Sequence, residues 1–332
     1  MRLRYITDDV PGFTRKKGLF SFVYVDEHGK KIRDGGVLKR LRALGVPPAY
    51  THVWFSPFEN GHIQATARDA RGRKQYIYHT DWTVKQTEVK FHRMDVFAGA
   101  LPRIRRKVGH DLALHGMPKE KVLAAIVRLL DTTYIRIGNE EYAEQNHSFG
   151  LTTLQDRHVH GTGERMRIVF RGKSGVSHEV ALKDARLRKI VSACHDLPGQ
   201  ELFAYLDAEG RAHDVSSEDV NAYVKEISRE EITAKDFRTW HATVIAAEYL
   251  WQHPFPQTKK KAQHVVRDAI LRAARALGNT AAICKKSYVH PLVLTNYSRG
   301  CFVWKLPSEA LRRKYPYLHV QEVALVKFLN HL

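Results

Sequence analysis

The sequence is poor in cysteine and has no compact cluster of metal-binding residues. Three isolated cysteines occur in 332 residues, and no CxxC pair is present, which argues against a disulfide framework and a cysteine-based zinc site. The 19 histidines are scattered. The nearest pair, His158 and His160, lacks the i, i+4 spacing of a helical metalloprotease site. We therefore expect no bound metal.

Long apolar runs are also missing. No window approaches the about 18 uninterrupted apolar residues that indicate a membrane-spanning helix, so we expect no membrane segment. The first ten residues reach Asp8 and Asp9 before any apolar stretch, which argues against a secretory signal. These two absences lead us to expect an intracellular protein.

Acidic residues are outnumbered by basic ones. The chain carries 54 Lys and Arg against 35 Asp and Glu, a net charge of +19. The excess is +8 over residues 1–90 and +11 over residues 91–332, so it is not confined to a basic tail. A polyanion that touches both parts explains this distribution, and a nucleic acid is the first candidate. A generally basic soluble protein is the alternative that charge alone leaves open.

The pattern of apolar residues changes near residue 90. Before it, a β-rich stretch at 19–25 predicts one strand, and stretches at 62–68 and 73–80, joined by a turn with Gly72, predict a hairpin. A short helix is expected over Val37–Leu44. This part of the chain is therefore predicted to be mainly β.

After residue 91 the apolar spacing becomes helical. Pro118 suits a first helical position, Ser217 and Asp236 can each cap a helix, and Gly278 suits the left-handed residue that ends one. A β-hairpin is expected at 167–182.

Together these patterns predict an α+β protein with two domains. A small β-rich N-terminal domain (1–90) precedes a larger, mainly α-helical domain (91–332) that includes a small hairpin, and the linker is expected near 81–95.

Two arginines occupy positions that favour a bound anion. Arg136 follows a helix that is predicted over 118–133, in TTYIRIGN. Arg238, in KDFRT, is expected in the first turn of a helix, where a cation is unfavourable beside the positive helix end unless an anion is also bound. A phosphate there would meet backbone N–H groups and a bidentate guanidinium. The alternative is that both arginines pair with local carboxylates such as Asp236 or Glu140.

Lys173 is expected at the tip of the 167–182 hairpin, in RGKSG. A lysine on such a hairpin can reach into a groove and donate a proton to an oxygen that leaves a phosphate. An ordinary exposed turn lysine is the alternative. The full GxxxxGK[ST] spacing of a nucleotide-binding loop is absent.

Asn279 and Tyr288 stand nine residues apart in LGNTAAICKKSY. Asn279 comes just after a predicted helix end, where its amide can donate a hydrogen bond. A tyrosine hydroxyl has a pKa of about 10 and is a poor nucleophile unaided, but cations and a positioned phosphate make its attack feasible. A half-buried structural tyrosine is the alternative.

The N-terminal hairpin contains RDARGRKQYIYH at 68–79. Its basic residues can contact phosphates, Gln75 can pair with a base edge, and Tyr76 and Tyr78 share one face of the strand. An edge strand with ordinary aromatic packing is the alternative. The candidate DNA-binding residues are Arg68, Arg73, Lys74, Gln75, Tyr76, Tyr78 and His79.

Taken together, six segments resemble the type IB DNA topoisomerases, in particular the small poxvirus-like and bacterial branch. They run in family order and span most of the chain. The segments are GRKQYIYH (72–79), TTYIRIGNEEY (132–142), SFGLTTL (148–154), FRGKSGVSHEV (170–180), KDFRT (235–239) and LGNTAAICKKSY (277–288).

The resemblance implies the fold of the tyrosine recombinase/type IB topoisomerase kind and a phosphoryl transesterification. Tyr288 would attack one DNA strand, form a 3′-phosphotyrosyl bond and release a 5′-hydroxyl end. The duplex would swivel before religation. Lys173 would be the general acid for the leaving oxygen, while Arg136, Arg238 and Asn279 would hold the non-bridging oxygens. No ATP, metal or other cofactor is implied.

One position departs from the poxvirus pattern, which has histidine where this chain has Asn279. Asparagine can donate a hydrogen bond but cannot become cationic, so we predict a hydrogen-bonding and steric role. His241, one turn beyond Arg238, is a possible further DNA contact, although a structural role is the stronger interpretation.

The resemblance also implies a partner and a location. The partner is double-stranded DNA, bound by a monomer that closes around it as a clamp, with the 68–79 hairpin in the major groove. A cytoplasmic, nucleoid-associated bacterial protein is expected. The alternative functions are a tyrosine site-specific recombinase and a non-catalytic DNA-binding protein.

Overall fold

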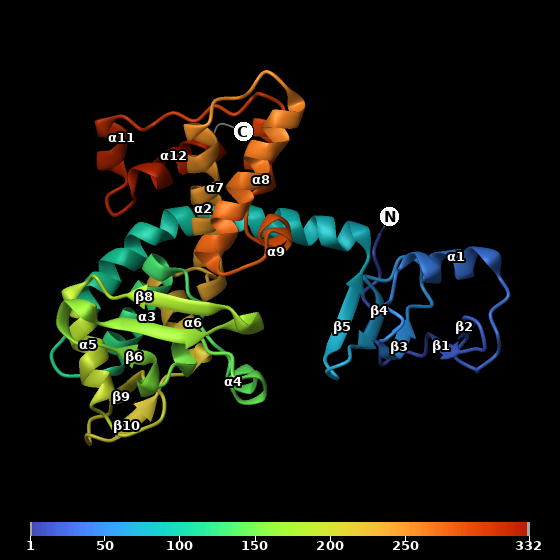
Figure 1. Ribbon diagram of the computed structural model, residues 1–332, viewed down its shortest axis with the longest axis horizontal. Helices are drawn as coiled ribbons and strands as arrows, with labels where there is room; N and C mark the ends of the chain where they lie inside the picture. The colour runs from blue at the N-terminus through green and yellow to red at the C-terminus, as the bar shows by residue number, and fades with distance from the viewer. Residues whose placement is uncertain (1, 331–332) are drawn as a thin grey trace. The chain divides into compact units, whose positions relative to one another are not determined.

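Residues 2–330 are described by a computed structural model, in which the chain forms two units (Figure 1). The first unit ends at His92 and the second begins at Arg93. The first is built around a β-sheet and the second is mostly helical, which confirms the predicted α+β class. Within residues 2–330, no helix is both long and apolar enough to cross a membrane.

The first unit holds a five-stranded antiparallel sheet in the order β2-β1-β3-β4-β5. Helix α1 (Gly35–Ala43) connects the second and third strands, and its Leu41 packs with Phe55 in the core. The strands are β1 (Phe13–Lys17), β2 (Phe22–Val25), β3 (Thr51–Phe55), β4 (Ile63–Arg68) and β5 (Lys74–Tyr78). The predicted hairpin is therefore present as β4 and β5.

The predicted strand over 19–25 is wrong in its first half. The Gly18 N–H donates to the Ser21 carbonyl at 2.9 Å, which closes a tight turn between β1 and β2. Leu19 and Phe20 lie in that turn and are 98% and 100% exposed. Apolar side chains alone therefore misplaced the start of the strand, because the turn was not recognised.

Helix α2 (Thr80–Asp111) has 32 residues and includes the stretch where a linker was expected. The helical pattern was expected from about residue 91, but the helix starts at Thr80. Its first turns show exposed apolar residues such as Val84 and Val89, so they carry no clear buried stripe that sequence reading could detect.

The second unit is organised around helix α7 (Ala234–Gln252), which packs against α8 (Lys259–Leu277) and α3 (Lys119–Thr133) (Figure 1). Phe237 and Trp240 of α7 are fully buried. The other helices are α4 (Glu140–Asn146), α5 (Ala185–His195), α6 (Ser217–Ser228), α9 (Ala281–Ser287), α10 (Pro291–Ser298), α11 (Glu309–Lys314) and α12 (Val320–Leu329).

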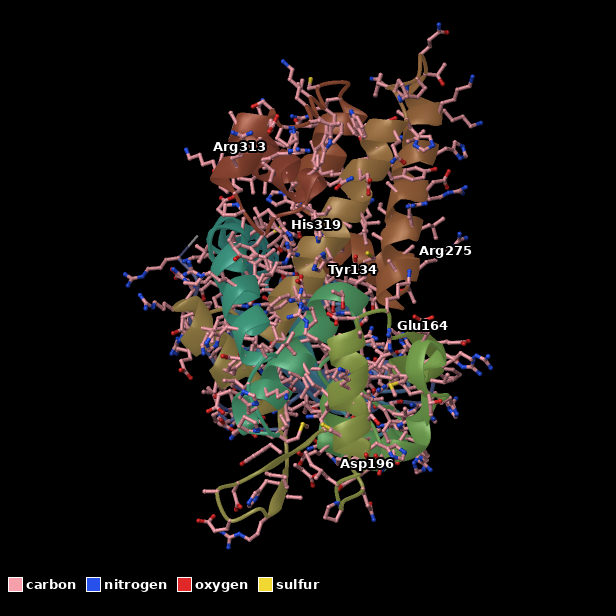
Figure 2. All side chains as sticks on the ribbon, turned by 90° about the vertical axis from the view of Figure 1, so that its left-hand side faces the viewer. Tyr134, Glu164, Asp196, Arg275, Arg313 and His319 are labelled. Carbon is pink, nitrogen blue, oxygen red and sulfur yellow. The ribbon has the colours of Figure 1, made fainter. Side chains whose placement is uncertain are left out.

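Two small antiparallel sheets complete the second unit. The three-stranded sheet has the order β6-β7-β8, with β6 (Val159–His160), β7 (Arg167–Arg171) and β8 (Ser177–Ala181). The predicted 167–182 hairpin is thus confirmed as β7 and β8. A second hairpin comprises β9 (Ala204–Leu206) and β10 (Ala212–Asp214). Charged side chains such as Arg275 and Arg313 project from the helices of this unit (Figure 2).

Two helix caps lie one and three residues before the predicted positions. Helix α6 is capped by Ser216 and helix α7 by Thr233, not by Ser217 and Asp236. In α7 the Asp236 carboxylate instead accepts from the Thr233 N–H at 2.8 Å, as the third residue of a capping box. The cap at Gly278 is confirmed, with φ +59°.

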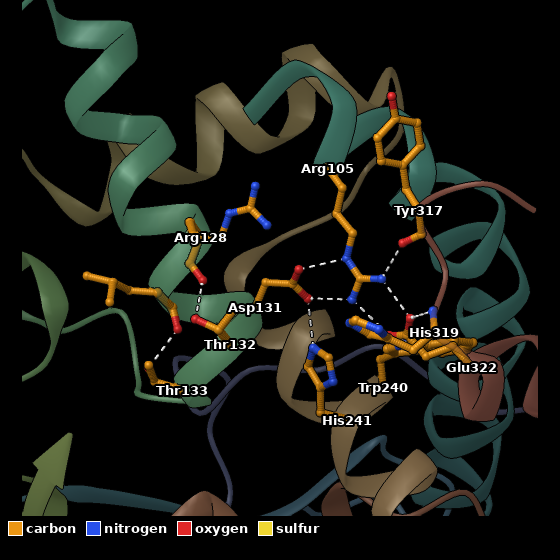
Figure 3. A network of polar contacts seen from close by, with 11 residues as sticks. Arg105, Arg128, Asp131, Thr132, Thr133, Trp240, His241, Tyr317, His319 and Glu322 are labelled. Atoms are coloured by element: carbon orange, nitrogen blue, oxygen red, sulfur yellow. Dashed lines mark hydrogen bonds and ion pairs between the residues drawn. The ribbon is translucent and has the colours of Figure 1, made fainter. Parts of the chain in front are cut away.

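Four helices of the second unit meet at a buried charged cluster (Figure 3). Arg105 of α2 donates to Asp131 of α3 at 2.7 and 3.0 Å and to Glu322 of α12 at 2.6 and 2.9 Å. From α7, the Trp240 indole donates to Glu322 at 2.9 Å and His241 bonds Asp131 at 2.9 Å. The cluster therefore ties α12 and α2 to the two helices that lead into the candidate site.

The charges of this cluster depend on one another. Burial acts to raise the pKa of the Asp131 carboxyl, but hydrogen bonds from His241 and Arg105 outweigh it and lower that pKa. For Arg105, burial is likewise outweighed by the two carboxylates, which raise its pKa. Removing one partner would leave the others charged and buried without compensation.

We expect Arg105→Ala to lower the free energy of unfolding by about 3–5 kcal/mol, because Asp131 and Glu322 would remain buried without their cation. Urea denaturation followed by circular dichroism measures the change. Arg106→Ala is the matched control, since Arg106 is the exposed neighbour, and it should change stability by no more than about 0.5 kcal/mol. Equal losses of unfolding free energy for the two substitutions would contradict the conclusion that the charged cluster stabilises the protein.

Candidate active site

Arg136 lies in a segment that is fixed on both sides by backbone contacts. Helix α3 ends at Thr133, as predicted, and Tyr134 follows in the left-handed conformation with φ +60°. The Leu151 N–H donates to the Arg136 carbonyl at 2.9 Å. A Cβ atom on Gly150 would lie 2.5 Å from the Gly138 Cα, so the two backbone segments can approach only because residue 150 is glycine, and Gly138 itself has φ +116°.

Arg238 is buried at the start of α7 and bridges the ends of two other helices. It is 3% exposed. One terminal nitrogen donates to the Tyr134 carbonyl just after α3, and the other donates to the Leu277 carbonyl at the end of α8, at 2.9 Å. Carbonyls at helix ends have no partner within the helix, so Arg238 satisfies them. It is the fifth residue of α7 and not part of the first turn as expected.

The expected alternative of local carboxylate pairing is not what these contacts show. Arg136 donates to the side-chain oxygen of Asn279 and to the Gly278 carbonyl at 3.4 Å. The Asp236 carboxylate accepts from the Thr233 N–H in the capping box of α7 and lies 3.6 Å from Arg93. The two arginines are therefore held by neutral oxygens, which leave their positive charge uncompensated by these contacts.

The side-chain oxygen of Asn279 has a hydrogen-bond partner, whereas its NH₂ group has none among the described residues. Its oxygen accepts from Arg136, which orients the group so that the NH₂ points elsewhere. Among the described residues, neither Asn279 Nδ2 nor Arg238 Nε has a hydrogen-bond partner, although both atoms are buried. Buried N–H donors without a partner are costly, and an anion between these two groups would satisfy both.

Tyr288 is the cap residue that follows helix α9, and it lies beside Arg238. The Arg238 guanidinium carbon lies 5.3 Å from the centre of the Tyr288 ring. The Tyr288 N–H donates to the Cys284 carbonyl at 2.9 Å, and its carbonyl accepts from Thr243 Oγ1 at 3.1 Å. These bonds to α9 and α7 fix the backbone of the tyrosine.

Lys173 lies at the tip of the β7–β8 hairpin, as predicted, in a short 3₁₀ turn (Lys173–Gly175). Its side chain is exposed and lines a cavity of about 340 Å³ together with Arg136, Arg238 and Tyr288. Asn279 joins this group through its contact with Arg136. The structure therefore brings together all five residues that were predicted as catalytic.

The cavity is strongly electropositive. Four cationic residues line it, and none of the described lining residues carries a carboxylate. Burial, and then the nearby Arg136, lower the pKa of Arg238 to about 10. Burial also lowers the pKa of Arg136. Both arginines remain cationic at neutral pH, so the site suits a phosphate.

Sequence reasoning missed several lining residues. Lys235 lies three residues before Arg238, and Asn139, Ser148 and Phe149 also face the cavity. Lys235 belongs to the KDFRT segment and Asn139 to TTYIRIGNEEY, so proximity to a recognised motif was the available signal. Within residues 2–330, no three His, Cys, Asp or Glu side chains are grouped in a way that could hold a metal ion.

His241 has the structural role that was the stronger interpretation. It is 6% exposed and bonds Asp131 at 2.9 Å. Its ring centre lies 4.6 Å from that of Tyr134. It therefore supports the residue whose carbonyl holds Arg238.

In the first unit, the β4–β5 hairpin carries the candidate DNA-binding residues. Tyr76 and Tyr78 share one face, as predicted: their rings stack at 6.0 Å and are 45% and 43% exposed. Gln75 lies on the other face and donates to Asp69 at 3.1 Å. Arg68 donates to the Gly72 carbonyl at 2.7 Å, and His79 accepts from the Asp81 N–H at 3.1 Å.

Two carboxylates hold the remaining cations of this hairpin. Lys74 lies 2.7 Å from Asp8, and Arg73 lies 2.7 Å from Asp69. The hydrogen bond from Arg73 holds the pKa of the Asp69 carboxyl below its usual value. Asp69 thus orients both Arg73 and Gln75.

Comparison with known proteins gives consistent matches over both units. The family described as the catalytic core of eukaryotic DNA topoisomerase I matches residues 74–305, and the N-terminal domain of bacterial DNA topoisomerase IB matches residues 21–69. The first match includes all five residues that were predicted as catalytic.

Individual viral proteins are similar over most of the chain. DNA topoisomerase 1B of Acanthamoeba polyphaga mimivirus is 28% identical over 296 residues, which covers 87% of this chain and 88% of that protein. DNA topoisomerase 1B of vaccinia virus is 26% identical over 233 residues, covering 68% and 69%. DNA topoisomerase 1 of rabbit fibroma virus is 24% identical over 275 residues, covering 76% and 79%.

Proposed function

This chain belongs to the type IB DNA topoisomerases, and from that membership we propose that Tyr288 is the nucleophile with which it cuts and reseals one strand of duplex DNA. The Tyr288 oxygen attacks the scissile phosphorus, a 3′-phosphotyrosyl bond forms, and the bond to the 5′-oxygen breaks. The released 5′-hydroxyl end swivels about the intact strand, which relaxes supercoils. Attack by the same hydroxyl on the phosphotyrosine restores the strand.

The observation that supports this role most strongly is the pair of unpartnered donors beside Tyr288. Arg238 Nε and Asn279 Nδ2 are buried and have no partner among the described residues. A scissile phosphate in the cavity would accept from both, with Arg136 completing the set. These donors would stabilise the charge that develops on the non-bridging oxygens in the transition state.

Lys173 is the proposed general acid. Its hairpin places it on the lining of the same cavity as Tyr288, and an ammonium group can protonate the leaving 5′-oxygen. The phosphotyrosyl bond retains the energy of the phosphodiester that was cut, so religation needs no ATP. The cations of the site supply the charge stabilisation, and we infer that no metal is required.

We expect purified protein to relax supercoiled plasmid in EDTA without ATP, and Tyr288→Phe to abolish relaxation while duplex binding is retained. Agarose gels measure relaxation, and a nicked suicide substrate on a denaturing gel detects the covalent adduct. Tyr297→Phe is the control, since its hydroxyl donates to the His253 carbonyl at 2.7 Å, outside the cavity lining.

Relaxation by Tyr288→Phe, or an absolute need for ATP or magnesium, would contradict the proposal. An adduct on the 5′ end of the cut strand would contradict its chemistry. Exchange between paired target sites with little relaxation would instead indicate a recombinase, and binding without any adduct would indicate a non-catalytic protein.

Asn279→Ala tests the role of the Asn279 Nδ2 donor. We expect single-turnover cleavage to slow by about 10²–10³, the usual cost of removing one such donor, while duplex affinity changes little. Asn296→Ala is the matched control because its side-chain nitrogen is also buried without a described partner, but Asn296 belongs to α10 and not to the segment that contacts Arg136. Equal cleavage rates for Asn279→Ala and the unmodified protein would exclude this role.

Members of this family bind duplex DNA, and we propose that the chain does so as a monomer that closes around the duplex as a clamp. The net positive charge of both parts supports this arrangement. In it, the β4–β5 hairpin enters the major groove, where Lys74 meets a phosphate and Gln75 a base edge. A cytoplasmic, nucleoid-associated location is proposed with it.

We expect Lys74→Ala to weaken duplex binding uniformly and to reduce the slope of log K against log salt by about one. Gln75→Ala should leave the slope unchanged and alter affinity only for some sequences, by about 1–3 kcal/mol. Fluorescence anisotropy at several salt concentrations measures both, and sedimentation should give one chain per short duplex. Unchanged duplex binding by both variants would show that the hairpin is not part of the DNA interface.

A further inference from the structure

The side chain of His178 in β8 lies between two glycines from different elements. A Cβ atom on Gly172 would lie 2.8 Å from its Cδ2, and a Cβ atom on Gly278 would lie 2.4 Å from its Cε1. The imidazole also stacks on Phe170 of β7, with ring centres 5.0 Å apart and planes 10° from parallel. The ring therefore occupies space that only glycine at both positions leaves open.

Each of these glycines immediately precedes a residue of the site. Gly172 comes before Lys173, at the tip of the β7–β8 hairpin, and Gly278 comes before Asn279, at the end of α8. Lys173 itself is exposed. Two bonds close the hairpin tip internally, from the Gly172 N–H to the Val176 carbonyl at 2.8 Å and from the Gly175 N–H to the Gly172 carbonyl at 3.0 Å. The His178 ring packs against both the hairpin tip and the end of α8.

We propose that His178 is a positioning residue that seats the Lys173 hairpin against the end of α8, so that the lysine reaches the leaving oxygen of the scissile phosphate. This inference rests on the proposed function. Asn279 does not depend on the ring in the same way, since its side chain is held by Arg136 and its N–H donates to the Ala274 carbonyl at 2.9 Å. Loss of the imidazole should therefore affect proton donation more than phosphate binding.

The ring acts as a neutral packing group and not as a proton donor of its own. Burial, and then the nearby Arg136 and Arg238, lower the pKa of His178. It is therefore neutral at neutral pH. A phenyl ring has similar shape and can stack on Phe170, so His178→Phe should retain most of the positioning that His178→Ala loses.

The test compares two DNA substrates that differ in one atom. In the second, sulfur replaces the bridging 5′-oxygen of the scissile phosphate. The bond from the Tyr288 oxygen to phosphorus forms, the phosphorus–sulfur bond breaks, and its electron pair leaves on sulfur as a thiolate. Thiols have pKa values of about 8.5, so this departure needs no general acid.

We expect His178→Ala to slow single-turnover cleavage of the oxygen substrate about 10- to 100-fold, which is less than the about 10²- to 10⁴-fold that a general acid contributes, because Lys173 itself remains. Cleavage of the sulfur substrate should stay within about threefold of the unmodified protein. Lys173→Ala should show the same pattern with a larger loss. His160→Ala, an exposed histidine of the same sheet, should cleave both substrates normally.

A double-mutant cycle links the effect to the contact. Gly172 has φ −90°, which alanine adopts without strain, so Gly172→Ala should slow cleavage only by displacing the ring. Adding it to His178→Ala should then cause no further loss. Additive losses would overturn the proposed contact.

Three other outcomes are decisive. Equal slowing of both substrates by His178→Ala, with His178→Phe equally impaired, would overturn the inference, because general-acid positioning would not be the step affected. Absence of any Tyr288 adduct from the unmodified protein on either substrate would instead remove the proposed function itself. Normal cleavage of both substrates by His178→Ala would leave the function intact and reject the role of His178.

Discussion

The site depends on one buried guanidinium that joins the ends of two helices. Arg238 satisfies carbonyls after α3 and at the end of α8, and the segments that follow these helices carry Arg136 and Asn279. A buried cation is costly unless its donors are used, and here two nitrogens are used by the fold while Nε remains for a ligand. The two terminal nitrogens of Arg238 thus stabilise the fold, while its Nε can donate to a bound anion.

A chain of contacts connects Arg238 to the buried charged cluster of the second unit. Tyr134, which provides one of its acceptors, packs on His241, and His241 bonds the Asp131 carboxylate shared with Arg105 (Figure 3). Glu322 brings α12 into the same cluster. A helix almost at the end of the chain therefore contributes to the geometry of the cavity without lining it.

Local signals predicted the parts of the site, but not how they are held. The Gly278 cap, the end of α3 and the hairpin tip at Lys173 follow from residues adjacent in sequence, and all three were predicted. The Arg105–Glu322 pair spans 217 positions, and His178 meets a glycine 100 residues away, so neither contact leaves a pattern in one sequence. The turn at Gly18 and the start of α2 were misread because apolar side chains are exposed there.

The pairing of hairpin cations with Asp8 and Asp69 has a consequence for selectivity. A phosphate that engages Lys74 or Arg73 competes with a carboxylate that is already in place. The binding free energy gained from each contact is therefore the difference between the interaction of the cation with the phosphate and its interaction with the carboxylate. Isolated anions such as chloride or free phosphate gain little from such an exchange. A polymer that presents phosphates at fixed intervals can make several exchanges at once, so in the proposed interface the hairpin would favour an extended backbone over small anions in the surrounding solution.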